Sequence, residues 1–320
     1  MSEQYLIYGL EMSPYSVKVR SWFRYKQIDH VWVQRSMARM PDFQALAKLP
    51  LIPLVQCPEG EVLQDSTPII ETLEQRHPQP PMQPASPVLA FLSAMLEEYA
   101  DEWLNKPMFH YRWSRPMDQD SAALRIAREQ MPGQPDEALA PVVDFLRTRM
   151  VPRLAFVGSH AGTASLIEQS FHEVLALLET HLATRPYLFG GRPCLADFGL
   201  YGQLRELASD PTPGLVMREC VPAVMAWLAR MEAPVAEGEF ETEATLLPAL
   251  RPLIEEQVGG YFLPWSQANE QALAQGQTEF SVTLAGRPFS QQVQKYHARS
   301  LAALRQKQAG LSLPEWVPVA

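Results

Sequence analysis

Tyr8 and Ser13 lie at a predicted strand-to-helix junction near the start of the chain. Residues 5–8 are an apolar run typical of a central strand. Ser13 followed by Pro14 opens a helix, because serine is a favoured N-cap and proline suits the first helical position. The free N–H groups and partial positive charge of a helix N-terminus stabilise an anion such as a phosphate or a thiolate. Ser13 is therefore the candidate hydrogen-bond donor to such an anion; the structural alternative is a plain helix cap.

Two further motifs follow in the same part of the chain. Ile52-Pro53 opens a predicted hairpin, and Asp65-Ser66 starts another helix. The predicted elements are a strand at 5–8, a helix from 13, a strand at 31–33, a helix that Pro50 ends, a hairpin of 52–55 and 62–63, and a helix from 65. This order, β-α-β-α-β-β-α, occupies about 80 residues. In the first helix Lys18 is predicted to lie away from the apolar face.

Prolines divide this first unit from the rest of the chain. Those at positions 78, 80, 81, 84 and 87 predict an extended linker, because proline interrupts helices. Beyond them the apolar spacing predicts helices over 88–104, 121–129, 137–156, 164–183, 196–208 and 221–231. After Pro234 we expect helices at 246–258 and 264–274, a hairpin of 280–284 and 289–293, and a last helix at 294–308.

Composition limits the classes of partner. The 320-residue chain carries a net charge of −9, so it repels a phosphate backbone and nucleic-acid binding is not expected. No apolar run approaches the roughly 20 residues that span a bilayer. Residues 1–9 lack a basic leader, so we expect a cytoplasmic protein without a membrane partner. The three cysteines form no CxxC pair and offer no metal-ligand spacing, so neither a disulfide framework nor a metal site is expected.

Four features in this order resemble the soluble glutathione transferases, especially serine-using classes such as theta, zeta and tau. They are Tyr8 with Ser13, Ile52-Pro53, Asp65-Ser66, and the segment from Gly190 to Asp197. The resemblance covers about residues 4–232 and is to a bacterial-type member with a C-terminal extension. It implies an α+β thioredoxin-like N-terminal domain at 1–77, a Pro-rich linker at 78–87, an all-α transferase C-terminal domain at 88–234 and a small α/β-hairpin extension at 235–320.

The resemblance also implies that glutathione is bound as a co-substrate. Ser13 would then donate a hydrogen bond to the glutathione thiolate, whose free thiol has a pKa near 8.5. Other transferase classes use a tyrosine at the end of the first strand, so Tyr8 is the rival donor; a core aromatic is the alternative. The backbone of Ile52, turned by a cis Pro53, would pair with the cysteinyl part; a trans proline is the alternative. Ser66 would hold the γ-glutamyl carboxylate and Asp65 the amino group, or the pair is a plain helix cap.

The chain departs from the family at two places. Many relatives carry Gly-Lys where this chain has Pro50-Leu51, and Lys48 is the candidate substitute for that lysine. Cys194 stands where the family usually has Ser or Thr three residues before the aspartate, here Asp197, so we interpret Asp197 as a structural helix cap.

The electrophile pocket is expected between the two domains, along the first helices of the second one. Arg112 would hold an anionic substrate and Trp113 would stack on a planar one; the alternative is an amphipathic packing segment. The substrate-binding candidates are Tyr99, Trp103, His110, Tyr111, Arg112 and Trp113. Tyr261, Phe262 and Trp265 are candidates for a lid over this cleft.

The leading hypothesis is an enzyme that adds the glutathione thiolate to a small electrophile, or uses it in substitution or isomerisation, without a metal. The resemblance implies a homodimer. The alternative is a non-catalytic interaction module, which Pro50-Leu51 and the long extension favour. A thiol-disulfide oxidoreductase is disfavoured, because serine stands at both Ser13 and Ser16, where a redox motif needs cysteine.

Overall fold

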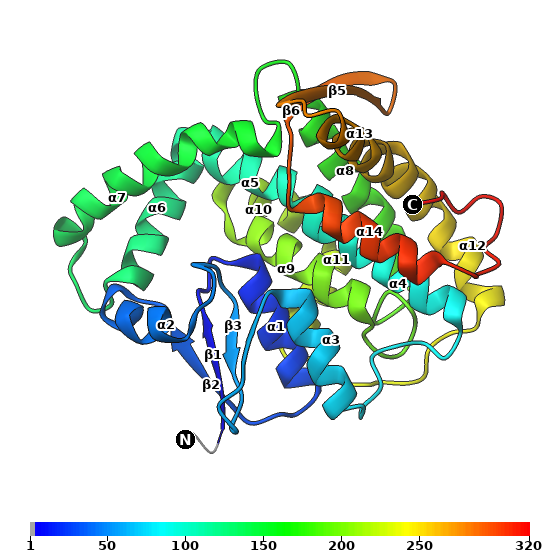
Figure 1. Cartoon of the computed structure of the whole chain (residues 1–320), viewed down its shortest axis with the longest axis horizontal. Helices are drawn as coiled ribbons and strands as arrows, with labels where there is room; N and C mark the ends of the chain where they lie inside the picture. The colour runs from blue at the N-terminus through cyan, green and yellow to red at the C-terminus, as the bar shows by residue number, and fades with distance from the viewer. Residues whose placement is uncertain (1–3) are drawn as a thin grey trace.

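The computed structural model describes residues 4–320 and shows a small sheet lobe beside a larger helical lobe (Figure 1). The sheet has the strand order β2-β1-β3-β4. Its elements are β1 (Tyr5–Gly9), α1 (Pro14–Tyr25), β2 (His30–Gln34), α2 (Met40–Leu46), β3 (Leu54–Gln56), β4 (Val62–Gln64) and α3 (Ser66–Arg76). The predicted β-α-β-α-β-β-α order is confirmed.

The pairing of the strands follows from their connections. β1 and β2 run parallel, because helix α1 carries the chain back across the sheet, and Tyr5 is paired with His30. β3 and β4 form the predicted antiparallel hairpin, with Val55 opposite Leu63. Ser13 and the start of α1 therefore follow the carboxyl end of the central strand β1.

The helical lobe contains two helices that the sequence analysis missed. They are α5 (Asn105–Ser114) and α10 (Pro211–Cys220), and each has a proline in its first helical turn, where proline is tolerated. The other elements are α4 (Pro87–Tyr99), a π-helical segment (Ala100–Leu104), α6 (Pro116–Gln130), α7 (Asp136–Met150), a 3₁₀ turn (Val151–Val157), α8 (Ala164–Leu182), α9 (Leu195–Ser209) and α11 (Pro222–Met231).

Helix α9 joins the two lobes. It packs against both α1 and α4, and nearly all of its side chains are buried. Gly202 makes the approach possible, since a Cβ there would lie 2.6 Å from the carbonyl oxygen of Pro14. Helix α1 is therefore covered on both sides, and Lys18, which we predicted on the polar face, is fully buried.

The last part of the chain is built onto the helical lobe. Its elements are α12 (Glu243–Leu253), a π-helical segment (Ile254–Phe262), α13 (Leu263–Ala274), β5 (Glu279–Leu284), β6 (Arg287–Gln292) and α14 (His297–Gln308). The predicted lid residues Tyr261, Phe262 and Trp265 are instead buried in the main hydrophobic core. Helix α14, drawn in orange-red, packs alongside α4 (Figure 1). Among residues 4–320 no helix combines the length and apolar character needed to cross a membrane.

Lys106 makes the stability of this packing dependent on pH. The side chain is buried, donates to Gln291 Oε1 at 2.8 Å, and places its ammonium 3.8 Å from the ring centroid of Trp265. Burial lowers the pKa of Lys106 to about 7, although the aromatic ring favours the ammonium. Between about pH 7 and pH 10 the folded chain then binds fewer protons than the unfolded chain. We expect the free energy of unfolding to rise with pH in this range, by at most about 1.4 kcal/mol per pH unit.

The variant Lys106→Met removes this titration while keeping an unbranched side chain. Urea unfolding of both proteins at pH 7, 8 and 9 measures the effect. The free energy of unfolding of the wild type should increase relative to that of the variant as the pH rises. Parallel pH profiles would contradict the assignment.

Candidate functional site

A cavity of about 690 Å³ lies between the sheet lobe and the helical lobe. Loop 49–53, the end of β4 and the start of α3 form one wall, and α1, α4 and the following π-helical segment contribute to the opposite side. Residues of helix α14 line the cavity as well. The lining residues are Tyr15, Leu49, Leu51, Ile52, Pro53, Gln64, Asp65, Thr67, Pro68, Glu71, Ala94, Glu98, Asp101, Glu102, Gln294, Tyr296, His297, Arg299, Ser300, Ala303, Leu304 and Lys307.

Two of the predicted motifs meet on the sheet-lobe wall. The Ile52–Pro53 peptide bond is cis, as the resemblance implies, and both residues line the cavity. Asp65 lines it as well, with a φ of 78°, a backbone conformation that residues other than glycine rarely adopt. Its side chain makes no cap hydrogen bond to α3. The N–H groups of Ser66 and Thr67 belong to the first turn of α3, which has no intrahelical acceptors for them.

Ser66 itself is turned away from the cavity. Its side chain is buried, and its hydroxyl oxygen accepts a 3.4 Å hydrogen bond from Lys18 Nζ. The same ammonium pairs with Glu97 at 2.5 Å and with Asp101 at 2.6 Å. The cation thereby connects α1, α3 and α4, so the network sets the distance between the two walls.

Gln64 fixes the loop before the cis-proline. Its Oε1 accepts from the backbone N–H groups of Lys48 and Leu49, and its Nε2 donates to the carbonyl groups of Leu49 and Leu51. The Lys48 side chain is exposed and is not part of the cavity lining. The conformation of the loop at this wall therefore depends on the hydrogen bonds of the Gln64 side-chain amide, at the end of β4.

Ser13 is the N-cap of α1 and remains partly exposed. Its Oγ accepts from the backbone N–H of Ser16 at 3.3 Å and from the Ser16 hydroxyl at 3.0 Å. In this arrangement the Ser13 O–H is left to donate. Tyr15, two residues on, reaches the cavity and donates its hydroxyl to the carbonyl of Asp101 at 3.0 Å.

The loop before Ser13 is held by the helical lobe. The Met12 carbonyl accepts a 3.0 Å hydrogen bond from Arg112 Nη1, and Glu129 accepts from the backbone N–H groups of Glu11 and Met12 at 2.6 and 3.1 Å. Burial raises the pKa of Glu129 to about 7, although these two N–H groups oppose the rise. The position of Ser13 thus depends on contacts from α5 and α6.

The predicted electrophile-binding residues do not line the cavity. Tyr99, Trp103 and Tyr111 lie in the main core and Trp113 in a second apolar cluster, because α4 and α5 are covered by neighbouring helices. His110 is buried, with hydrogen bonds to Ser159 at 2.7 Å and Glu168 at 2.9 Å. Arg112 is buried between Glu206 and Asp210. The six side chains therefore serve in packing and ion pairs.

Tyr8, the rival donor, is also part of the packing. It is 6% exposed and packs with Phe43 and Leu54 on the far side of β1 from α1. Burial raises the pKa of its hydroxyl further above the neutral range. Neither Tyr8 nor Ser13 is among the residues that line the cavity, and of the two only Ser13 is partly exposed.

Helix α14 supplies side chains that the sequence did not connect with the site. Tyr296, just before the helix, donates its hydroxyl to Asp65 Oδ2, and Lys307 pairs with Glu71 at 2.6 Å. The cavity carries the carboxylates Asp65, Glu71, Glu98, Asp101 and Glu102 against the cations Arg299 and Lys307. The cavity is therefore acidic. The Tyr296 and Lys307 contacts also tie α14 and the residue before it to the N-terminal half of α3.

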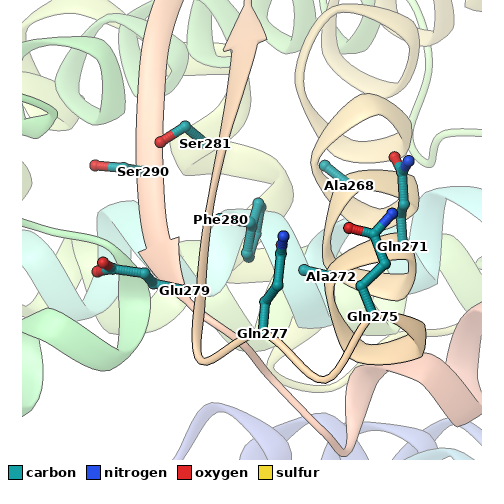
Figure 2. Close-up of a pocket in the computed structure, with 9 residues that line it drawn as sticks. All are labelled: Ala268, Gln271, Ala272, Gln275, Gln277, Glu279, Phe280, Ser281 and Ser290. Atoms are coloured by element: carbon teal, nitrogen blue, oxygen red, sulfur yellow. The ribbon is translucent and has the colours of Figure 1, made fainter.

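A second hollow lies between α13 and the β5–β6 hairpin. Figure 2 shows Gln271 and Gln275 on the helix, with Gln277 and Phe280 between the helix and the strands. Its polar groups are amides, two serine hydroxyls and the single carboxylate of Glu279. This set offers hydrogen bonds but neither a nucleophile with a base nor a cluster of charges, so the chemistry is assigned to the cavity between the lobes.

Family models match both lobes. The model for the glutathione S-transferase N-terminal domain matches residues 7–81, and that for the C-terminal domain matches residues 161–230. The order of these matches agrees with the order of the sheet lobe and the helical lobe. The chain is a member of the glutathione transferase-like superfamily. A search of curated proteins found no significant match to it.

Two solved structures are among those similar to this chain. The beta-etherase LigF from Sphingobium sp. strain SYK-6 is 19% identical, with 72% of this chain and 95% of LigF covered and a TM-score of 0.50. A glutathione S-transferase from Methylobacterium radiotolerans JCM 2831, in complex with glutathione sulfonate, is 21% identical over 74% of this chain and 97% of its own, with a TM-score of 0.44. Each therefore covers about three quarters of this chain.

The cavity-lining residues that the sequence analysis did not predict fall into two groups. Gln64 and Tyr15 adjoin the motifs Asp65-Ser66 and Ser13-Pro14, so their positions in the chain offered a signal. The residues from α14 offered none. They reach this transferase-like cavity only because the extension folds back over α4.

Proposed function

We propose that the chain is a glutathione transferase-like enzyme that binds glutathione in the cavity between the lobes and activates its thiolate for attack on a small electrophile. The observation that carries the proposal is the meeting of three groups at one wall: the cis Ile52–Pro53 bond, the Asp65 carboxylate and the free N–H groups at the start of α3. The electrophile would react by conjugation, substitution or isomerisation. A homodimer belongs to the same proposal, and light scattering of the purified protein measures it.

The wall matches the polar groups of glutathione. The backbone of Ile52 would pair with the cysteinyl part, and the N–H groups of Ser66 and Thr67 would hold the γ-glutamyl carboxylate at the positive end of α3. Asp65 would accept hydrogen bonds from the amino group. Because the Ser66 hydroxyl faces Lys18, the carboxylate would depend on the backbone groups.

Ser13 would act at the sulfur. Its O–H donor and the N-terminus of α1 favour the thiolate over the thiol and so lower the thiol pKa toward neutrality. The thiolate sulfur then forms a bond to the electrophilic carbon while the leaving group departs with its electron pair, or the pair moves onto an acceptor atom of the substrate. Ser13 donates a hydrogen bond throughout and forms no covalent bond.

The electrophile would occupy the rest of the cavity, between α4 and α14. Tyr15, Ala94, Ala303 and Leu304 provide its less polar surface. This assignment replaces the six substrate-binding residues expected from the sequence, between Tyr99 and Trp113.

A non-catalytic interaction module is the second candidate. Tyr296 already donates to Asp65, and α14 covers the cavity, so the polar groups of the wall are partly occupied by the chain itself. In that case glutathione would find no free site.

Titration of reduced glutathione by calorimetry distinguishes the two functions. Wild type should bind with a Kd between micromolar and low millimolar, and Asp65→Ala should weaken binding by about 10- to 100-fold, as expected for a lost charge-assisted hydrogen bond. Glu59→Gln, an exposed carboxylate on the hairpin outside the cavity, is the matched control and should leave binding unchanged. In Ser13→Ala, binding should persist while turnover of an electrophile panel falls.

The absence of binding by wild type at several millimolar, checked by ligand-observed magnetic resonance because heats can cancel, would contradict the enzyme. Partner capture would then test the interaction module.

A further inference from the structure

We propose that Glu98, Glu102 and His297 bind a divalent transition-metal ion that holds α14 over the cavity. One potential ligand atom from each residue lies within 4.8 Å of the others. All three residues line the cavity, so an ion there would be reachable from it. The inference does not depend on glutathione binding.

The backbone brings the two carboxylates to one place. Glu98 lies in the last turn of α4, and Glu102 lies four residues on, in the π-helical segment that continues it. Residues four apart share one face of a helix, so both side chains point toward α14. His297 is the first residue of α14 and faces them.

His297 is oriented as a metal ligand would be. The side chain is 1% exposed and its ring centroid lies 4.5 Å from that of Trp265. Its Nε2 is hydrogen-bonded to the hydroxyl of Ser266. When Nε2–H donates to that hydroxyl, the lone pair is on Nδ1 and is free to bind a metal ion. A histidine that binds a metal through one ring nitrogen is commonly oriented by a hydrogen bond from the other, as Nε2 makes here.

The nitrogen that would bind the ion has no hydrogen bond. Nδ1 of His297 is buried without a hydrogen-bond partner, 3.3 Å from Glu102 Oε2. Oε1 of Glu98 is also buried without one. Buried polar atoms are nearly always hydrogen-bonded, so these two atoms, with the Glu102 carboxylate close by, are suited to bind a cation.

The local charge favours a cation. Glu97, Glu98, Asp101 and Glu102 occupy one stretch of helix, and Lys18 pairs only with Glu97 and Asp101. The remaining partner near Glu98 is the neutral Ser300 hydroxyl. A divalent ion would compensate the charges of Glu98 and Glu102.

The donor set points to the class of metal. An imidazole nitrogen with two carboxylates suits zinc, manganese or cobalt, whereas magnesium and calcium prefer oxygen donors alone. Three protein ligands beside a cavity leave coordination positions for water or a bound molecule.

The chain contains a matched control. Cys57, Glu59 and Glu61 form a second group of potential ligands, but both glutamates are exposed and already pair with Arg76, at 3.1 and 2.6 Å. We expect this group to bind no ion tightly.

Titration of Co²⁺ into the full chain, first stripped with a chelator and kept free of glutathione, tests the site. We expect one ion per chain with visible d–d absorption, a Kd of about 10 µM or tighter, and displacement by Zn²⁺. The double variant Glu98→Gln/Glu102→Gln should bind at least about 100-fold more weakly. Glu59→Gln/Glu61→Gln should bind as wild type does. His297→Gln should lose the nitrogen contribution to the cobalt spectrum.

The proposal is overturned if wild type binds no stoichiometric ion, or if Glu98→Gln/Glu102→Gln binds the ion as tightly as wild type does. Circular dichroism confirms that each variant is folded. Should His297→Gln disturb α14, the double glutamine variant decides alone, because glutamine keeps the size of each side chain. Loss of glutathione binding in a separate titration has no bearing on this result.

Discussion

Replacing Arg112 by methionine should lower the free energy of unfolding by about 3–5 kcal/mol, the range for removing one partner of a buried ion pair. The guanidinium is 3% exposed and pairs with Glu206 at 2.6 Å and Asp210 at 2.8 Å. Both carboxylates are fully buried side chains, so the variant leaves two charges without their main partner. Arg125 and Arg205 still contact them and keep the cost near the lower end of this range.

Activity should fall by more than the loss of stability explains. Arg112 also donates to the Met12 carbonyl, directly before Ser13, so its removal frees the loop that places the Ser13 donor. Urea unfolding and turnover on the same preparations measure both effects. Arg128→Met, which breaks the exposed pair with Asp136, is the control and should change neither quantity. A loss of less than about 1 kcal/mol for Arg112→Met would contradict the role given to the buried pair.

Asp197→Ala should destabilise the chain by about 4 kcal/mol or more, because the carboxylate accepts from three buried N–H donors. It accepts from the backbone N–H of Leu188 at 3.0 Å, from that of Cys194 at 2.9 Å, and from Trp227 Nε1 at 3.0 Å. Alanine would leave all three unpartnered at the start of α9. The structural cap predicted from the sequence is confirmed, with Cys194 as the N-cap residue.

The comparison with an ordinary cap isolates the effect of burial. Ser86 caps α4 and accepts from the Leu89 N–H at 3.1 Å in a partly exposed position, so Ser86→Ala should cost about 1 kcal/mol. Thermal and urea unfolding measure the loss of stability in Asp197→Ala and in Ser86→Ala, and the two losses are then compared. Equal losses would mean that the Leu188 and Trp227 contacts add nothing to the cap.

The sequence by itself determined the sheet lobe and the order of its motifs. Strands, turns and helix starts depend on residues within a few positions of one another, and Ser13-Pro14, Ile52-Pro53 and Asp65-Ser66 each carry such a local pattern. The same reasoning found most helices of the second lobe. It missed α5 and α10, each of which carries a proline in its first helical turn.

Only the tertiary structure decided which side chains face the cavity. Residues 110–113 are amphipathic in sequence, but whether such a side chain faces a cavity or a neighbouring helix depends on what packs against it, and here α8, α9 and α6 do. Lys18 is buried because α9 covers the second side of α1. His297 meets Glu98 and Glu102, and Tyr296 meets Asp65, because the extension folds back across α4. These contacts join segments far apart along the chain, and no local pattern encodes such a meeting.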